Sequence, residues 1–348
     1  MGDDAAMGDV FLGREAMADG LSRHELRRWY RPLFRGAYIQ KRATPTLTDR
    51  AVGAWLTSDR RGIIAGVAAS ALHGAAWVDD TERIEILVDD RRRQSGLIIR
   101  MDRVADDEVT TAVGLPVTTL ARTAFDLGRY QKRSAAIARL DALMRAAPFS
   151  ADEVTMLMQR YGPVRGVRQL RELLPLVDPG AASPKESWLR LLLIDNGFPI
   201  PETQIPVLDG YMPFAFLDMG WRHIHLAVEY DGDQHRTDRP QYVKDMRRHP
   251  KIAKRGWEVV RVIAEDKESE ILAAAYEAWL RRGGAEIDKM ARSTRTNPPN
   301  PLCQAGCESV GGQQGAWWCQ LVRVLPRQRW WSWFMSITCN RMVRRRRG

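Results

Sequence analysis

Cysteine is absent from the first 302 residues of this 348-residue chain. The four cysteines all lie near the C-terminus, at Cys303, Cys307, Cys319 and Cys339. A body without cysteine needs no disulfides and fits a reducing compartment, so we expect a cytoplasmic protein. The spacing of the four cysteines differs from that of paired CxxC zinc motifs, so we expect no zinc site there.

Long apolar runs are also missing. No stretch of about 18 uncharged apolar residues occurs, which excludes a membrane-spanning helix from the prediction. The first residues are acidic and lack the basic start and apolar centre of a secretion signal. The apolar fraction of 45% is nevertheless ordinary for a globular protein with a buried core.

Lysine is absent from residues 291–348, which hold ten arginines and a single acidic residue, Glu308. This segment therefore carries +9 of the formal net charge of +10, and the remainder of the chain is nearly neutral. Any basic DNA-binding surface on the body must then be local. The Trp-rich and Arg-rich segment admits three interpretations: a surface-binding segment, a phosphate-binding cluster, or a non-native reading frame. We favour the last and expect residues 286–348 to be disordered.

The N-terminal region has the pattern of a helix-turn-helix followed by a hairpin. A short helix closes at Gly20, and Ser22 with Glu25 forms a capping box for a second, basic helix, which we expect Pro32 to end. The candidate DNA contacts are its exposed arginines and one in the hairpin: Arg23, Arg27, Arg28 and Arg35. A solvated basic helix without ligand is the alternative.

Further along, residues 62–77 are rich in Ala and Gly and predict a closely packed helix ending at His73, which we interpret as a capping or core histidine. Alternation predicts strands at 83–90 and 97–104, and residues 119–129 predict a helix. Residues 7–130 resemble the AbiEi-type antitoxin family, in an RGxY turn at 35–38, an LHG motif at 72–74 and a TAxDL helix at 123–127. The resemblance implies a winged-helix DNA-binding region, transcriptional control and a cognate toxin as a protein partner.

Residues 131–182 predict a connector of three helices, the second of which has Ser150 as its N-cap. The Pro- and Gly-containing turn at 178–184 marks a domain junction. Acidic residues with metal-binding potential follow. Glu186 lies in the first turn of a helix capped by Ser183, Asp218 lies on a predicted strand, and Glu229 lies on the next strand of a hairpin. Carboxylates on neighbouring strands are typical ligands of a divalent cation. Glu186 could equally complement the helix dipole.

This order resembles the PD-(D/E)XK nuclease fold, closest to its very-short-patch-repair-like (Vsr-like) branch. The resemblance covers about residues 183–265, within a domain that we predict over 183–285. It rests on Glu186, Asp218, the ExDGxxH block from Glu229 to His235, Asp245 with Arg248, and the GWxVxR block at 256–261. It implies that Asp218, Glu229 and the Tyr230 carbonyl bind Mg²⁺. It also implies that Glu186 completes the site, that His235 acts as an acid, base or phosphate contact, and that Arg248 contacts DNA. Asp231 stands where the superfamily usually has lysine.

We therefore predict an α+β protein with an N-terminal winged-helix-like domain and a C-terminal restriction-endonuclease-like αβββαβ domain. The candidate catalytic residues are Glu186, Asp218, Glu229, Asp231 and His235. The first functional hypothesis is a Mg²⁺-dependent DNA endonuclease guided by the N-terminal domain. The alternative is a DNA-binding antitoxin or transcriptional regulator whose nuclease-like domain is inactive. Arg261 is predicted to pair with a carboxylate or to contact phosphate, and the structural role is favoured.

Overall fold

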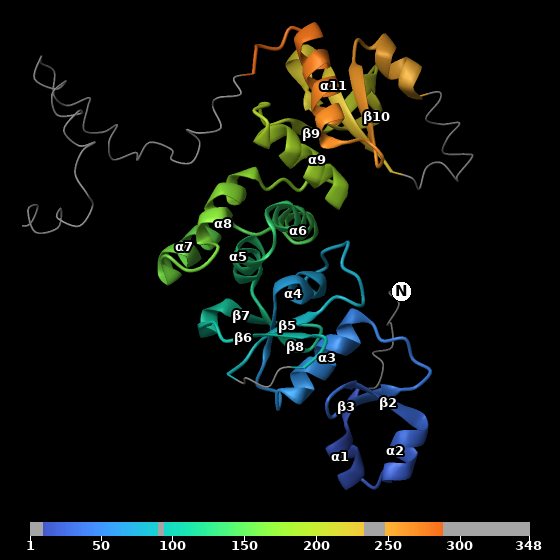
Figure 1. Ribbon diagram of the computed structural model, residues 1–348, viewed down its shortest axis with the longest axis vertical. Helices are drawn as coiled ribbons and strands as arrows, with labels where there is room; N and C mark the ends of the chain where they lie inside the picture. Colours follow the sequence, from blue (N-terminus) through green and yellow to red (C-terminus); the bar gives the residue numbers. More distant parts are fainter. Residues whose placement is uncertain (1–9, 90–93, 233–247, 288–348) are drawn as a thin grey trace, which may run out of the picture. The chain divides into compact units, whose positions relative to one another are not determined.

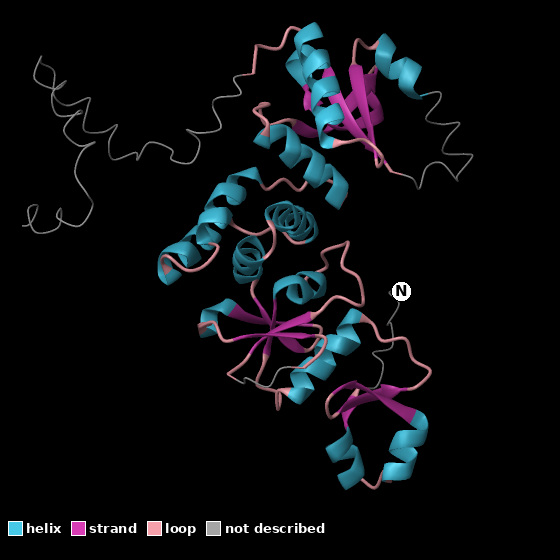
Figure 2. Ribbon diagram, in the orientation of Figure 1, coloured by secondary structure: helices cyan, strands magenta, loops and turns pink. Residues whose placement is uncertain are grey.

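The computed structural model describes residues 10–89, 94–232 and 248–287 (Figure 1). Helices and strands occur together along the chain, which confirms the predicted α+β class (Figure 2). Predictions for His235, for Asp245 and for the segment 288–348 lie outside the described residues. Within the described residues, no helix combines the length and the apolar character needed to cross a bilayer.

The N-terminal region has the predicted order of helix, turn, helix and hairpin. Its elements are β1 (Phe11–Leu12), α1 (Gly13–Ala18), α2 (Arg23–Trp29), β2 (Tyr30–Phe34) and β3 (Ala37–Gln40), with sheet order β1-β3-β2. The predicted capping box is present, since Ser22 accepts from the Glu25 N–H and Glu25 accepts from the Ser22 N–H. Pro32 does not end α2 as predicted. The helix stops at Trp29, and Pro32 lies inside β2.

A mixed sheet forms the next layer. It has the order β6-β5-β4-β8-β7, and β4 is parallel to β8 and antiparallel to β5. The elements here are α3 (Leu47–Thr57), β4 (Ile63–Ala65), α4 (Gly66–Leu72), β5 (Ile84–Leu87), β6 (Leu97–Arg100), η1 (Asp106–Glu108), β7 (Val109–Ala112) and β8 (Leu115–Thr118). The aliphatic core of this layer includes Ile64, Ile84, Ile86 and Val117, all at most 1% exposed.

The predicted helix over 62–77 is wrong at both ends. Ile63–Ala65 is a strand, and the helix α4 ends at Leu72. The change from strand to helix occurs at Gly66, whose φ is +58°. A Cβ there would meet the Glu85 carboxylate at 2.4 Å, so only glycine fits this turn. His73 is the predicted structural histidine, with Nε2 2.8 Å from the Thr118 carbonyl oxygen.

A helical layer follows and encloses its own core. It consists of α5 (Leu120–Tyr130), α6 (Arg133–Ala146), α7 (Ala151–Tyr161), α8 (Val167–Leu173) and the 3₁₀ turn η2 (Leu174–Leu176). Leu127, Ile137, Leu140 and Leu170 are fully buried between these helices. The N-cap that the sequence predicts for α7 is confirmed, because Ser150 accepts from the Glu153 N–H.

The C-terminal part of the described chain is a four-stranded sheet of order β12-β11-β10-β9 between helices. Its elements are α9 (Pro184–Asp195), β9 (Glu202–Asp209), β10 (Met212–Trp221), the 3₁₀ turn η3 (Arg222–Ile224), β11 (Leu226–Asp231), β12 (Glu258–Ile263) and α11 (Glu268–Arg281). Strands β9, β10 and β11 are antiparallel, and β12 is parallel to β11. One face packs against α9 and α11, and the other against the helix at 248–254 through Ile252 (Figure 1).

This arrangement contains the predicted αβββ…αβ order, although the sequence pattern did not reveal β9. The hairpin expected to carry Asp218 and Glu229 is present as β10 and β11. Its two strands approach closely at Gly220, where a Cβ would meet the Leu226 carbonyl oxygen at 2.3 Å. The ladder between them runs in register from Trp221↔Leu226 to Met219↔Val228 and ends just before the acidic residues.

Candidate functional site

The first candidate surface is the basic face of α2 and the β2–β3 turn, which we call the α2 surface: Arg23, Arg27, Arg28 and Arg35. All four side chains are exposed. Within the described part of the chain, none of them forms an ion pair with a carboxylate. In the neighbouring helix α1, by contrast, Arg14 forms an ion pair with Asp59, with 2.7 Å between Arg14 Nη2 and Asp59 Oδ1. The α2 surface therefore keeps its positive charge available to an anionic partner.

The geometry of α2 supports this arrangement. Leu26 is its only buried residue, so the helix rests on one apolar contact and presents its other side chains outward. The Arg28 guanidinium lies 4.9 Å from the Trp29 ring centroid, a distance at which the exposed indole orients the cation. In the turn, the Arg35 N–H donates to Gln94 Oε1 at 2.9 Å, which fixes the backbone and leaves the guanidinium exposed.

The second candidate site is the acidic end of the β10–β11 hairpin. Asp218 Oδ2 accepts a hydrogen bond of 3.0 Å from the Tyr230 N–H, a donor that the strand ladder would otherwise use. The two strands therefore separate at this position, and Asp218 and Glu229 lie close to each other. Burial, and next the nearby Glu229 charge, raise the pKa of Asp218 to about 6. The sequence prediction that these two carboxylates meet is consistent with this coupling.

Both acidic residues of β11 have arginine partners. Glu229 is 7% exposed and bonds to Arg248 at 2.8 Å, and Arg248 also donates to the Phe216 carbonyl oxygen. Asp231 pairs with Arg261, which gives Arg261 the carboxylate-binding role that the sequence favoured. Arg248, predicted to contact DNA, is thus engaged within the protein.

Glu186 takes part in the cap of α9. Its carboxylate accepts from the Ala182 N–H at 2.8 Å and from the Ser183 hydroxyl at 3.0 Å. Burial and then the Asp218 charge raise the pKa of Glu186. The capping role is therefore observed, and the role of Glu186 in a metal site stays a prediction. Glu186 caps the helix and is electrostatically coupled to the acidic hairpin.

The acidic hairpin has part of the donor set of a divalent cation, since carboxylate oxygens suit Mg²⁺. Among the residues that the structure describes, however, no group of three or more His, Cys, Asp and Glu side chains is placed to hold a metal ion. Arginines neutralise Glu229 and Asp231 instead, so the described residues do not by themselves fit a magnesium centre, and His235 lies outside them. The role of the Tyr230 carbonyl as a metal ligand stays a prediction.

A hollow that no sequence motif indicated lies between α6 and the start of α9. It has a volume of about 360 Å³, and Trp77 and Arg145 line it. Neither residue belongs to a recognisable motif, and they are brought together by tertiary structure alone. An isolated Trp after an Ala-rich helix was the one available indication in the sequence.

Comparisons with known proteins locate a family match in the middle of the chain. Residues 63–176 match the model of the AbiEi antitoxin C-terminal domain. This segment begins at β4 and includes α5 to α8, so most of the predicted connector over 131–182 lies inside the matched domain. The match does not reach residues 183–285, where the nuclease resemblance stays a prediction from the sequence motifs.

Two relatives come from Mycobacterium tuberculosis. The uncharacterized proteins MT2308 (strain CDC 1551 / Oshkosh) and Rv2248 (strain ATCC 25618 / H37Rv) are each 29% identical to this chain over 216 residues, covering 62% of it and 79% of their own length. Among solved structures, the RV2827C protein of Mycobacterium tuberculosis is similar over 48% of this chain and 71% of its own, with 17% identity and a TM-score of 0.35.

Proposed function

We propose that this protein is a DNA-binding regulator of the AbiEi antitoxin type and that the α2 surface contacts the DNA. The observation that carries the proposal is the set of exposed arginines on α2 and the adjoining turn, which have no acidic partner among the described residues. The antitoxin-domain match over 63–176 supports it. A cognate toxin is the protein partner that the same match favours.

The chemistry of this surface is that of phosphate contacts. Guanidinium groups bind phosphate oxygens in a bidentate manner and release condensed counterions, so binding weakens steeply with salt. A helix with a hairpin beside it is the arrangement in which helix-turn-helix proteins place side chains against a duplex. The α2 surface thus provides sequence-independent affinity first, and base contacts add specificity.

The test is fluorescence anisotropy with a random-sequence duplex at increasing salt. We expect the Arg27→Ala/Arg28→Ala variant to bind less tightly and to lower the slope of log K against log salt by about 1 for each arginine–phosphate pair that the variant removes. Arg165→Ala/Arg171→Ala removes two exposed arginines from the helical layer and serves as the matched control. Equal affinities for the wild type and the α2 variant would refute the proposal.

A second candidate function is a Mg²⁺-dependent DNA endonuclease, favoured by the coupling between Asp218 and Glu229 in the β10–β11 hairpin. Buried carboxylates with raised pKa values are a common property of functional sites. Supercoiled, nicked and mismatched DNA would be incubated with Mg²⁺ or Mn²⁺. Cleavage by the wild type that disappears in both Asp218→Ala and Glu229→Ala supports the enzyme. Absence of cleavage by the wild type leaves the regulator.

A further inference from the structure

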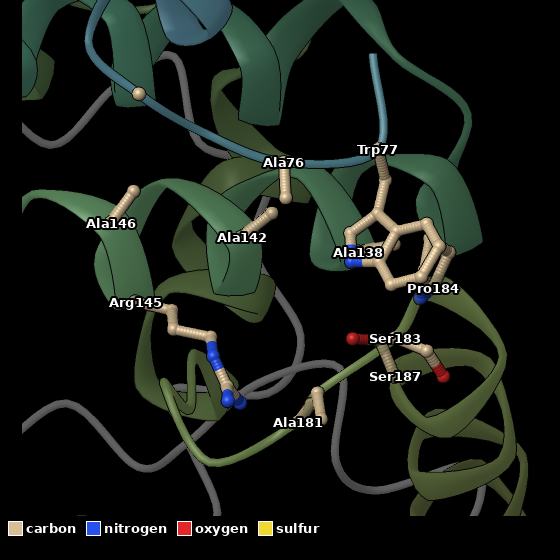
Figure 3. A pocket seen from close by; sticks show the side chains of 12 residues that line it. Ala76, Trp77, Ala138, Ala142, Arg145, Ala146, Ala181, Ser183, Pro184 and Ser187 are labelled. Carbon is tan, nitrogen blue, oxygen red and sulfur yellow. The ribbon is translucent and has the colours of Figure 1, made fainter. Parts of the chain in front are cut away.

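The hollow of about 360 Å³ is walled by elements from three parts of the chain (Figure 3). One face of α6 contributes small side chains and a cation, the bend after α4 contributes an indole, and the segment leading into α9 contributes the opposite wall. The lining residues used below are Ala76, Trp77, Ala142, Arg145, Ala146 and Ala181. Its volume lies within the range of small-molecule sites, roughly 300–1,000 Å³.

Trp77 is held in an unusual way. Its φ is +66°, a left-handed conformation that a bulky residue rarely adopts, and the residue is 54% exposed. The Trp77 carbonyl oxygen accepts a hydrogen bond from the Arg139 guanidinium. The same guanidinium forms an ion pair with Glu82, with 3.8 Å between Arg139 Nη2 and Glu82 Oε2. The protein therefore fixes a strained backbone that exposes an indole face, an arrangement found at ligand-binding positions.

Arg145 provides the charge. Its side chain is exposed, it donates a long hydrogen bond of 3.5 Å to the Gly180 carbonyl oxygen, and the described residues give it no ion pair. The two serines that line the hollow are occupied elsewhere, since Ser187 donates to Asp141 and Ser183 to Glu186. Among the described residues that line the hollow, Arg145 is consequently the charged group available to a ligand.

Figure 3 shows the Trp77 ring and the Arg145 side chain at two ends of the hollow, with alanine methyl groups between them. An aromatic platform at one end, a guanidinium at the other and small apolar walls between them match a flat heteroaromatic ring linked to an anion. A base stacks on tryptophan, and arginine binds phosphate.

We propose that this hollow binds a nucleotide, with the base against Trp77 and the phosphate at Arg145. The site is separate from the α2 surface and does not depend on the function proposed above. The same chemistry has two sources, a free mononucleotide and an unpaired nucleotide within a single strand, and the experiment separates them.

The full-length protein would be titrated calorimetrically with adenosine monophosphate, adenosine, inorganic phosphate and a short oligodeoxyadenylate. We expect Trp77→Ala and Arg145→Glu to weaken binding about tenfold or more. Ala146→Leu, which fills the hollow from an exposed position, should do the same. Tyr211→Ala and Arg171→Ala change an exposed tyrosine and an exposed arginine elsewhere and should bind as the wild type does.

Binding of the mononucleotide that these variants weaken supports a free ligand. Binding of the oligonucleotide alone, weakened in the same way, supports a strand nucleotide. Arg145 is exposed, so the Arg145→Glu variant should fold. It therefore tests the proposal even if the Trp77→Ala variant fails to fold. The proposal is overturned if the wild type binds neither probe, or if Arg145→Glu and Ala146→Leu bind as tightly as the wild type.

Discussion

Arg122 of α5 is 1% exposed and yet charged, so its partners decide the stability of the helical layer. Its guanidinium bonds to Glu108 and, at 3.0 Å, to Asp126, and both acids are also buried. Removing one member of a buried network leaves the others without compensation. We expect Arg122→Met to lower the free energy of unfolding by about 3 kcal/mol or more, measured by urea denaturation.

Arg160→Ala is the matched control for that measurement, because Arg160 also bonds to Glu108 but is 45% exposed in its side chain. Its loss should cost much less than the loss of Arg122, since solvent screens an exposed pair. Similar costs for the two variants would show that burial of the Arg122 network does not determine its contribution.

Asp218 makes a pH-dependent contribution to the free energy of unfolding, and its raised pKa gives the sign of that contribution. Its pKa is raised from the ordinary 3.8 to about 6, so between these values the folded state binds more protons than the unfolded state. Stability conferred by this group therefore falls as pH rises through that window and stays lost above it. In EDTA, we expect Asp218→Asn to raise the unfolding free energy at pH about 8 by about 1–3 kcal/mol, and to give little gain at about pH 4.

Denaturant titrations of wild type and variant across that pH range provide the measurement. Asp209→Asn is the control, because it removes a carboxylate that is largely exposed. A gain for Asp218→Asn that is the same at every pH would contradict the assignment of the raised pKa to Asp218.

At the scale of elements, the stability of α2 depends on the capping box at its N-terminus. This helix has seven residues and a single buried side chain, so the Ser22–Glu25 capping box holds a large share of its order. We expect Ser22→Ala to cost about 1 kcal/mol and, on the proposed function, to weaken duplex binding severalfold. Anisotropy and thermal unfolding measure the two effects.

Ser150→Ala removes the corresponding cap from α7 and should cost similar stability. Its DNA affinity should equal that of the wild type, since α7 lies outside the α2 surface. If both serine variants lost DNA affinity equally, the effect would reflect general stability and not the order of α2.

Features set by neighbours in sequence were predictable. The caps at Ser22, Ser150 and Ser183 depend on residues three positions apart and were identified correctly. Strand β9 was not identified, because it is an edge strand that contains Pro206 and has exposed acidic residues at both ends, which weaken the alternation. Strand β4 has three residues and is hidden within an Ala- and Gly-rich run.

In the candidate sites, too, local features were predictable and contacts between distant segments were not. The acidic residues of the β10–β11 hairpin were found because strand alternation and turn spacing are local. Their arginine partners were not assigned, since Arg248 lies 19 residues from Glu229 and Arg261 lies 30 from Asp231. The hollow between Trp77 and Arg145 depends on three separate segments, and no sequence period connects them.

At the scale of the whole molecule, α6 and α9 are joined by a buried polar cluster. Arg190 of α9 bonds to Asp141 of α6 at 2.8 Å, and Ser187 donates to the same carboxylate at 2.7 Å. Both charged residues are 1% exposed. We expect Arg190→Met to cost about 3–5 kcal/mol in urea denaturation, because Asp141 then stays buried without its cation.

The double variant Asp141→Asn/Arg190→Met should recover a large part of that loss. Asparagine removes the uncompensated charge. Its Oδ1 still accepts from the Asp178 N–H, which donates to Asp141 Oδ1 at 2.8 Å in the wild type, and its Nδ2 can donate to the Ser187 hydroxyl, which bonds to the other Asp141 oxygen in the wild type. Costs that simply add in the double variant would show that the two residues act independently.

The Asp141–Arg190 pair also limits how such a protein can be recombined during evolution. A crossover between these two positions would bring together a helix from one parent and its ionic partner from another. Unless both parents carried the same pair, the hybrid would inherit an unmatched charge inside its core. The pair therefore favours exchange of the segments that carry α6 and α9 as one piece over their exchange as separate cassettes.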